Sequence, residues 1–282
     1  MKPAAVSVDL DPCAGSALYE RALPRWLEKL EAADIKATFF CVGSELKHAT
    51  ARTALRRAVA AGHEIGNHTL DHREPFAALD DATQRRQIVE SGQRLSDALG
   101  VPIAGFRAPA WDIDARALRT LEERDYAYDS SVCSAWAAPW LRLVARAVGR
   151  APGFGDARVA LAPATPYHPS AHAPWRRGDM RLVEVPTSVG AGGVMFWFSP
   201  VLAAGFGAIR ALGPFIKAAP APQWLCHGID LLDFERDADP ALAWRPGLRR
   251  PIAEKLAMID AIFKQLRQWF AVGTVAALAA HA

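Results

Sequence analysis

The sequence has few cysteines and no cysteine motif, and its first residues form no long apolar run. Its four cysteines form no Cys-x-x-Cys pair and are scattered, at Cys13, Cys41, Cys133 and Cys226. This spacing argues against a disulfide framework and against a zinc knuckle. The N-terminus reaches Asp9 and Asp11 before any stretch long enough for a signal peptide. We therefore expect reduced cysteines and a cytoplasmic protein.

The chain also lacks a strong excess of charge. Its net charge is +3 over 282 residues, and the aromatic pattern of an RNA-binding module is missing, so no nucleic-acid partner is expected. Hydrophobic residues make up 51% of the chain and charged residues 22%, which is ordinary for a folded enzyme. With neither an internal repeat nor a linker, this length predicts one large domain.

Apolar runs alternate with helical patterns along most of the chain. Runs typical of strands occupy residues 4–10, 36–43, 63–69, 103–109, 126–132, 182–188 and 223–228. Helical patterns occupy residues 18–33, 49–62, 81–100, 114–125 and 251–270. This alternation predicts repeated βα units and a parallel sheet that closes as a barrel. The rhythm breaks after residue 132, which indicates an insertion within one domain.

Two carboxylates stand at the end of the first predicted strand. Side chains alternate along a strand, so Asp9 and Asp11 point to one face, and Pro12 ends the strand directly afterwards. The carboxyl ends of strands are where barrel enzymes place their chemistry, and a divalent cation is a common partner for such a pair. Taken alone, the pair is also compatible with a turn that carries two solvated aspartates.

Two histidines follow the strand predicted at residues 63–69. In the stretch NHTLDH, His68 and His72 stand four positions apart, and either alone reads as a solvated or capping residue. Together with Asp11 they would supply one oxygen and two nitrogen ligands at neighbouring strand ends. Three such ligands leave a position for water, as a catalytic zinc site requires.

These motifs resemble those of the polysaccharide deacetylase family, the NodB-type carbohydrate esterases, in an Asp-x-Asp form. The resemblance rests on SVDLD (7–11), GHEIGNHTLDH (62–72), FRAPAW (106–111), YDSS (128–131) and LCH (225–227). It implies an α/β fold, an irregular (β/α)7 barrel. It also implies a single NodB-like domain over residues 1–282 that hydrolyses an N-acyl group on an amino sugar with the help of Zn²⁺ or another divalent transition metal.

The resemblance assigns a role to each motif residue. The metal ligands would be Asp11, His68 and His72. Asp9 would be the general base, held by Arg107, and His227 the general acid, held by Asp129; Pro109 and Trp111 would line the substrate cleft. An amide needs such an acid because an amine leaves poorly as an anion, and a histidine titrates near neutral pH.

Several functions remain open beside this one. The chain could act on soluble chitooligosaccharides or polysaccharides, remove a formyl rather than an acetyl group, attack a non-sugar amide such as a ureide, or bind glycans without catalysis. The sequence alone does not name the acyl group, the sugar or the native metal.

The predicted insertion, residues 133–181, is basic and has an amphipathic pattern. Residues 132–181 hold seven arginines and two aspartates. Trp136 and Trp140 stand among Arg142, Arg146 and Arg150, a pattern typical of a helix that lies on an anionic membrane. An uncharged run of 25 residues, 185–209, then contains two prolines and five glycines, so it predicts no continuous membrane helix.

We expect residues 187–222 to form an apolar hairpin or loop near the cleft. Together with the basic insertion, this segment favours a lipid-linked substrate, for example a sugar on a polyprenyl phosphate, and a peripheral contact with the inner face of the membrane. The alternative is that both segments cover the barrel core in the ordinary way.

Overall fold

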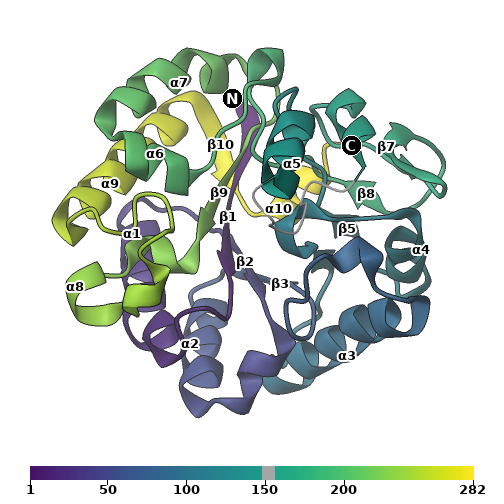
Figure 1. The fold of residues 1–282 in the computed structure, drawn as a ribbon, viewed down its shortest axis with the longest axis horizontal. Coiled ribbons are helices and arrows are strands. Elements are labelled where there is room, and N and C mark those ends of the chain that lie inside the picture. Colours follow the sequence, from purple (N-terminus) through teal and green to yellow (C-terminus); the bar gives the residue numbers. More distant parts are fainter. Residues whose placement is uncertain (148–155) are drawn as a thin grey trace.

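A computed structural model describes residues 1–147 and 156–282 (Figure 1). The strands of the main sheet are β1 (Lys2–Leu10), β2 (Thr38–Cys41), β3 (Glu64–Asn67), β4 (Gly105–Phe106), β5 (Tyr128–Asp129), β8 (Val183–Glu184), β9 (Gln223–His227) and β10 (Phe270–Gly273). A separate small sheet pairs β6 (Pro169–Ser170) with β7 (Ala173–Arg177). The helices are α1 (Leu23–Ala32), α2 (Ala49–Ala60), α3 (Asp81–Leu99), α4 (Ala115–Glu123), α5 (Ala138–Ala147), α6 (Phe198–Ala204), α7 (Phe206–Ala218), α8 (Phe234–Asp237), α9 (Ile252–Trp269) and α10 (Val275–Ala279).

The main sheet is parallel and forms an irregular barrel, as predicted. Neighbouring strands follow the order β10-β1-β2-β3-β4-β5-β8, and β9 pairs with the second half of β1. No ladder joins β8 to β9 among the described residues, but a backbone bond from Ser188 N–H to Gln223 O, 3.3 Å long, crosses the gap. Because β10 extends only the start of β1, the barrel wall consists of β1, β2, β3, β4, β5, β8 and β9.

Alternation along β1 separates two environments. Val6, Val8 and Leu10 belong to the large apolar cluster beneath the surrounding helices, which include α1 and α9. Ser7 and Asp9 point into the barrel instead, where Arg107 binds both. Every strand of the barrel wall overlaps an apolar run identified in the sequence.

Glycine keeps the barrel interior open for large aromatic rings. A Cβ on Gly105 of β4 would lie 2.1 Å from the Tyr128 ring, and one on Gly66 of β3 would lie 2.6 Å from the Phe40 ring. The two rings themselves meet edge to face, with centroids 6.4 Å apart. These aromatic side chains fill the barrel below the polar groups at its carboxyl end.

The insertion between β5 and β8 is partly structural. Val159, Met180 and Leu182 are buried in the same cluster as residues of α4, so this part covers the core. The amphipathic helix expected here is present as α5. Of the three arginines in the predicted amphipathic pattern, Arg150 lies outside the described residues, as do the side chains of Arg142 and Arg146.

Residues 187–222 differ from the predicted hairpin or loop. Only a single antiparallel bridge, Val189 to Met195, resembles a hairpin, and α6 and α7 occupy most of the remainder. Glycine and proline misled the prediction because Gly205 lies between the two helices, with φ of 83°, and Pro200 falls in the first turn of α6. No helix within the described ranges is long and apolar enough to cross a membrane.

Neutral His63 supports the start of β3. Its Nδ1 accepts a hydrogen bond from the Ala37 N–H at 3.1 Å, and its ring packs edge-on against Phe39. Burial, followed by the charge of Lys36, lowers the pKa of His63 from 6.5 to about 4. The unfolded chain therefore binds more protons between these pH values, so the stability that neutral His63 contributes decreases as the pH falls through this window.

We expect His63→Asn to reduce the acid sensitivity of folding, because an amide oxygen can accept the same bond without titrating. Urea unfolding of wild type and variant at pH 7 and pH 4.5 measures the change. The wild type should lose more free energy of unfolding than the variant between these pH values. Equal losses would show that His63 titrates normally in the folded protein.

Candidate active site

One cleft lies at the carboxyl ends of the barrel strands and holds most of the residues singled out in the sequence. Its volume is about 540 Å³. The residues that line it are Asp9, Asp11, His68, His72, Glu74, Ala108, Ala110, Trp111, His227, Trp244 and Arg245. The cleft thus joins side chains that follow β1, β3, β4 and β9 with a loop that precedes α9.

Asp11, His68 and His72 form a group with the chemistry of a metal site. One ligand atom from each residue lies within 4.8 Å of the other two. Asp11 Oδ1 is 3.6 Å from His68 Nε2 and 3.4 Å from His72 Nε2. Among the described residues, this is the one such group of three or more potential ligands. One carboxylate and two imidazoles suit a transition-metal ion.

The histidines determine the charge of Asp11. Burial would raise the pKa of Asp11, but the charge of His72 and hydrogen bonds from His68 and His72 hold it well below its usual range. In turn, burial opposes the charged form of His72, while the Asp11 carboxylate raises the pKa of His72 overall. The cluster therefore keeps an ionised carboxylate in a buried place, as a cation site requires.

Neighbouring groups fix the orientation of both histidines. His68 Nδ1 lies 2.8 Å from the carbonyl oxygen of Arg107, a contact that leaves Nε2 directed at Asp11. His72 Nδ1 lies 3.5 Å from Glu74 Oε1. Contacts of this kind on the far ring nitrogen are typical of histidines that bind metals.

The loop between the two histidines is held from α3. Gln87 Oε1 accepts the N–H groups of Leu70 and Asp71, each at 3.1 Å. Ser91 Oγ donates to the Thr69 carbonyl at 2.9 Å. His72 has a positive φ of 57°, and its N–H donates to Thr69 Oγ1. Helix α3 therefore maintains a strained turn that returns the second histidine to the first.

Asp9 and Arg107 form a buried ion pair at the base of the cleft. Arg107 Nη1 donates to Asp9 Oδ1 at 2.7 Å and to Ser7 Oγ at 2.9 Å. The guanidinium also donates to the carbonyl and the hydroxyl of Ser130 and lies 4.0 Å from the Phe40 ring centroid. The predicted contact between Arg107 and Asp9 is present in the structure.

His227 ends β9 and enters the same cleft. Its Nδ1 lies 3.2 Å from Ser199 Oγ, and that hydroxyl donates to Asp230 Oδ1 at 2.9 Å. Asp230 Oδ2 accepts the backbone N–H of His227 at 2.8 Å. Burial raises the pKa of Asp230, and the charge of His227 partly offsets that rise. Ser199 and Asp230 were not identified from the sequence, although Asp230 follows His227 by three positions.

Asp129 does not hold His227, which corrects the prediction. Tyr128 fills the interior face of β5, and alternation turns the next side chain, Asp129, to the opposite face. There Asp129 accepts a bond from Ser131 Oγ at 2.6 Å, beside Glu184 of β8. Burial, then the charge of Asp129, raises the pKa of Glu184 well above its usual range.

The Pro109–Trp111 turn forms one wall of the cleft. Ala110 and Trp111 line the cleft, both with positive φ, whereas Pro109 is buried beneath the turn. The Trp111 ring meets Trp197 edge to face, with centroids 5.6 Å apart. This contact brings part of the apolar segment 187–222 to the cleft, with Trp197 directly before α6.

Trp244 and Arg245 form a second wall that sequence reasoning missed. Arg245 Nη2 lies 3.4 Å from Asp11 Oδ2, the carboxylate oxygen opposite the one that faces the histidines. Its guanidinium lies 5.0 Å from the centroid of the Trp244 ring. These residues follow a helical turn (Pro240–Leu242) and carry no motif of their own, so only the folded chain brings them to Asp11.

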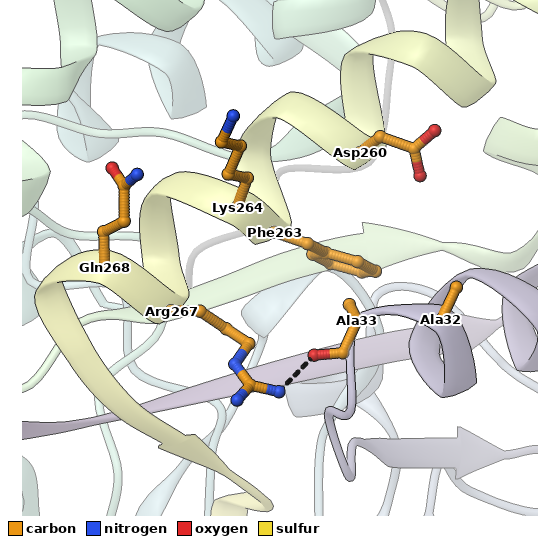
Figure 2. A pocket seen from close by; sticks show the side chains of 7 residues that line it. All are labelled: Ala32, Ala33, Asp260, Phe263, Lys264, Arg267 and Gln268. Atoms are coloured by element: carbon orange, nitrogen blue, oxygen red, sulfur yellow. Dashed lines mark hydrogen bonds between the residues drawn. The ribbon is translucent and has the colours of Figure 1, made fainter.

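A different hollow, of about 500 Å³, lies between α9 and the end of α1 (Figure 2). Arg267 bonds the Ala33 carbonyl there, and the carboxylate of Asp260 binds Lys29 at 2.8 Å. The lining contains neither histidine nor cysteine. This hollow therefore lacks the paired ligands and acid-base groups of the cleft.

Comparisons with known proteins agree with the motifs. Residues 2–128 match the family model described as polysaccharide deacetylase. A peptidoglycan deacetylase from Helicobacter pylori is 26% identical over 40% of this chain and 38% of its own length. A peptidoglycan-N-acetylglucosamine deacetylase from Bacillus cereus is 29% identical over 36% of each chain. The aligned region therefore spans little more than a third of these relatives.

Solved structures share the fold over nearly the whole chain. A Mycobacterium smegmatis structure assigned to the polysaccharide deacetylases has a TM-score of 0.64 at 19% identity, and covers 99% of this chain and 90% of that one. A CE4 family pseudoenzyme from Bacillus anthracis has a TM-score of 0.56 at 15% identity, and covers 99% of this chain and 65% of that one. The resemblance to the NodB-type polysaccharide deacetylases predicted from the motifs is confirmed over residues 2–128, and the solved structures share the fold.

We expect the Asp11–His68–His72 group to bind one equivalent of Zn²⁺. His68→Ala and His72→Ala should each lose most of the bound zinc, because two protein ligands hold the ion far more weakly than three. Metal content after dialysis against zinc, measured by mass spectrometry, provides the readout. His172→Ala, which changes an exposed histidine of the insertion, serves as the control. Full zinc content in either ligand variant would contradict the assignment.

Proposed function

We propose that this chain is a metal-dependent hydrolase that removes an N-acyl group from an amino sugar. The main support is the convergence of three kinds of group in one cleft. These are a potential metal site of Asp11, His68 and His72, the ion-paired carboxylate of Asp9, and His227 with its serine and aspartate. Amide hydrolysis needs such a set: activation of water, stabilisation of the oxyanion and protonation of the amine.

Asp9 is the proposed general base. A bound divalent ion supplies a Lewis acid for the carbonyl oxygen and lowers the pKa of water at the site toward ~7. Asp9 Oδ1 is held by Arg107 at 2.7 Å, which fixes the carboxylate and balances its charge. Its second oxygen is then the acceptor for the proton that the attacking water releases.

His227 is the proposed general acid for the departing amine. The contact of its Nδ1 with Ser199, and through that hydroxyl with Asp230, orients the ring. Because Nδ1 makes this contact, Nε2 is the ring nitrogen that can deliver a proton to the leaving nitrogen. In this proposal Asp230 replaces Asp129 as the carboxylate behind His227.

The roles of the two aspartates are separable by experiment. Asp9→Asn should retain zinc but lose at least about 100-fold in kcat, because it removes the base and leaves the ligands intact. Asp11→Asn should lose both zinc and activity. The measurements are metal content and amine release from N-acetyl and N-formyl chitooligosaccharides. Zinc loss in Asp9→Asn with retention in Asp11→Asn would exchange the two roles.

The same assay separates the alternatives. Release of formate alone would identify a deformylase. Release of acetate from chitin oligomers would identify a soluble N-deacetylase. A glycan-binding barrel without catalysis would bind these oligomers and release neither acid, even with zinc bound. The acyl group and the sugar are left to this measurement.

We further propose a lipid-linked substrate, as the α5 region favours contact with a membrane. Trp136 and Trp140 are 61% and 67% exposed, and Leu143 and Val144 are both 58% exposed. Trp140, Leu143 and Val144 are spaced three and one apart and lie on one face of α5, and Trp136 lies just before this helix. A contiguous apolar surface of this kind is typical of a binding site for a lipid or a partner. Phe196, by contrast, is buried and unavailable for such contact.

The membrane proposal predicts that the protein sediments with anionic liposomes. Trp136→Ser combined with Trp140→Ser should weaken sedimentation about tenfold or more, because two large aromatic side chains leave the interface. Phe206→Ser on α7, where Phe206 is 44% exposed, is the matched control. Absence of wild-type sedimentation, with rapid hydrolysis of soluble chitin oligomers, would leave a soluble deacetylase.

A further inference from the structure

The Trp244–Arg245 wall separates the cleft from a second hollow. This hollow, of about 460 Å³, is lined by Leu202, Ala203, Ala243, Trp244, Arg245, Pro246, Gly247, Arg249, Arg250, Pro251 and Glu254. Trp244 and Arg245 line both spaces. A substrate bound in the cleft can therefore extend over these two residues into the second hollow.

The loop that forms the second hollow has a defined conformation. Leu248 is buried, and its carbonyl accepts a bond from the buried Lys255 at 2.6 Å. Gly247 has φ of 74°, and a Cβ there would lie 2.3 Å from Leu202 of α6. Only glycine allows this close approach to α6. These contacts hold the loop in place as one wall of the hollow.

The arginines of the second hollow differ in what binds them. Arg250 is engaged by Glu254 at 2.6 Å and by the Leu202 carbonyl at 2.6 Å. Arg249 is exposed, and its guanidinium lies 5.3 Å from the centroid of the Phe234 ring. Arg249 forms no ion pair within the described parts of the chain. Its positive charge is therefore available to a ligand.

We propose that this hollow is an anion subsite that receives a carboxylate or phosphate group on the substrate, next to the acylated sugar. The inference rests on the proposed function, because it places the acylated sugar in the cleft. Trp244, 56% exposed, offers a face on which a sugar ring can stack. Arg249 binds the anion, with Arg245 adding positive charge beside it. A uronic or lactyl acid would supply a carboxylate, and a glycosyl phosphate would supply a phosphate.

Steady-state kinetics on matched substrates tests the subsite. The substrates are a neutral N-acetylchitooligosaccharide, an oligosaccharide of similar length with a carboxylate, and an N-acetylglucosaminyl phosphate. Arg249→Gln should raise KM about tenfold for at least one anionic substrate and leave kcat and the neutral substrate unchanged. Whichever anionic substrate responds identifies the source of the charge. Arg236→Gln on α8, outside the hollow, is the matched control.

Equilibrium binding separates failure of the subsite from failure of the proposed function. Inorganic phosphate or glucuronate should change tryptophan fluorescence in the wild type, and the change should be lost in Arg249→Gln and in Trp244→Phe. Such binding without hydrolysis of any substrate would support the subsite and refute the hydrolase. Hydrolysis with the same KM for neutral and anionic substrates would refute the subsite. The subsite would also be refuted if the only effect of Arg249→Gln were weaker sedimentation with liposomes.

Discussion

The ion pair of Asp9 and Arg107 is the interaction on which the rest of the cleft depends. Both side chains are buried, and the guanidinium joins β1 to the residues that follow β4 and β5 through Asp9, Ser7 and Ser130. A buried charge without its partner costs about 3–5 kcal/mol, so an apolar replacement of either residue would destabilise the cleft, whereas Asp9→Asn keeps an oxygen that accepts the Arg107 N–H. The Arg107 carbonyl oxygen also contacts His68 Nδ1, so one residue positions both the proposed base and a proposed metal ligand.

The two aspartates of β1 differ because the fold gives them different partners. Asp9 meets a permanent cation, whereas Asp11 meets two imidazoles through one oxygen and Arg245 through the other. Their shared face follows from strand alternation, but the difference in chemistry follows from long-range contacts. In our account this asymmetry lets one carboxylate accept protons while its neighbour binds a cation.

The features predicted correctly from the sequence are those that depend on short-range rules. Alternation placed Asp9 and Asp11 together, and the NHTLDH spacing placed His68 and His72 on one turn. The prediction that Asp129 holds His227 was wrong because the ring of Tyr128 occupies the interior side of β5. No local sequence pattern reveals this preference. Ser199, Arg245 and Arg249 lie on segments without motifs, and only the folded chain brings them to the cleft or the neighbouring hollow. The two helices within residues 187–222 were missed because Pro200 and Gly205 mark helix ends rather than a loop, and because α7 tolerates Gly213 and Pro214 in its interior.

The most direct test of this asymmetry is an anomalous-difference map at the zinc absorption edge from crystals of the zinc-loaded protein. The account predicts one peak, about 2.0–2.2 Å from His68 Nε2, His72 Nε2 and Asp11 Oδ1, with Asp9 still bound to Arg107. A peak coordinated by Asp9, or Asp11 turned away from the histidines toward Arg245 alone, would contradict it.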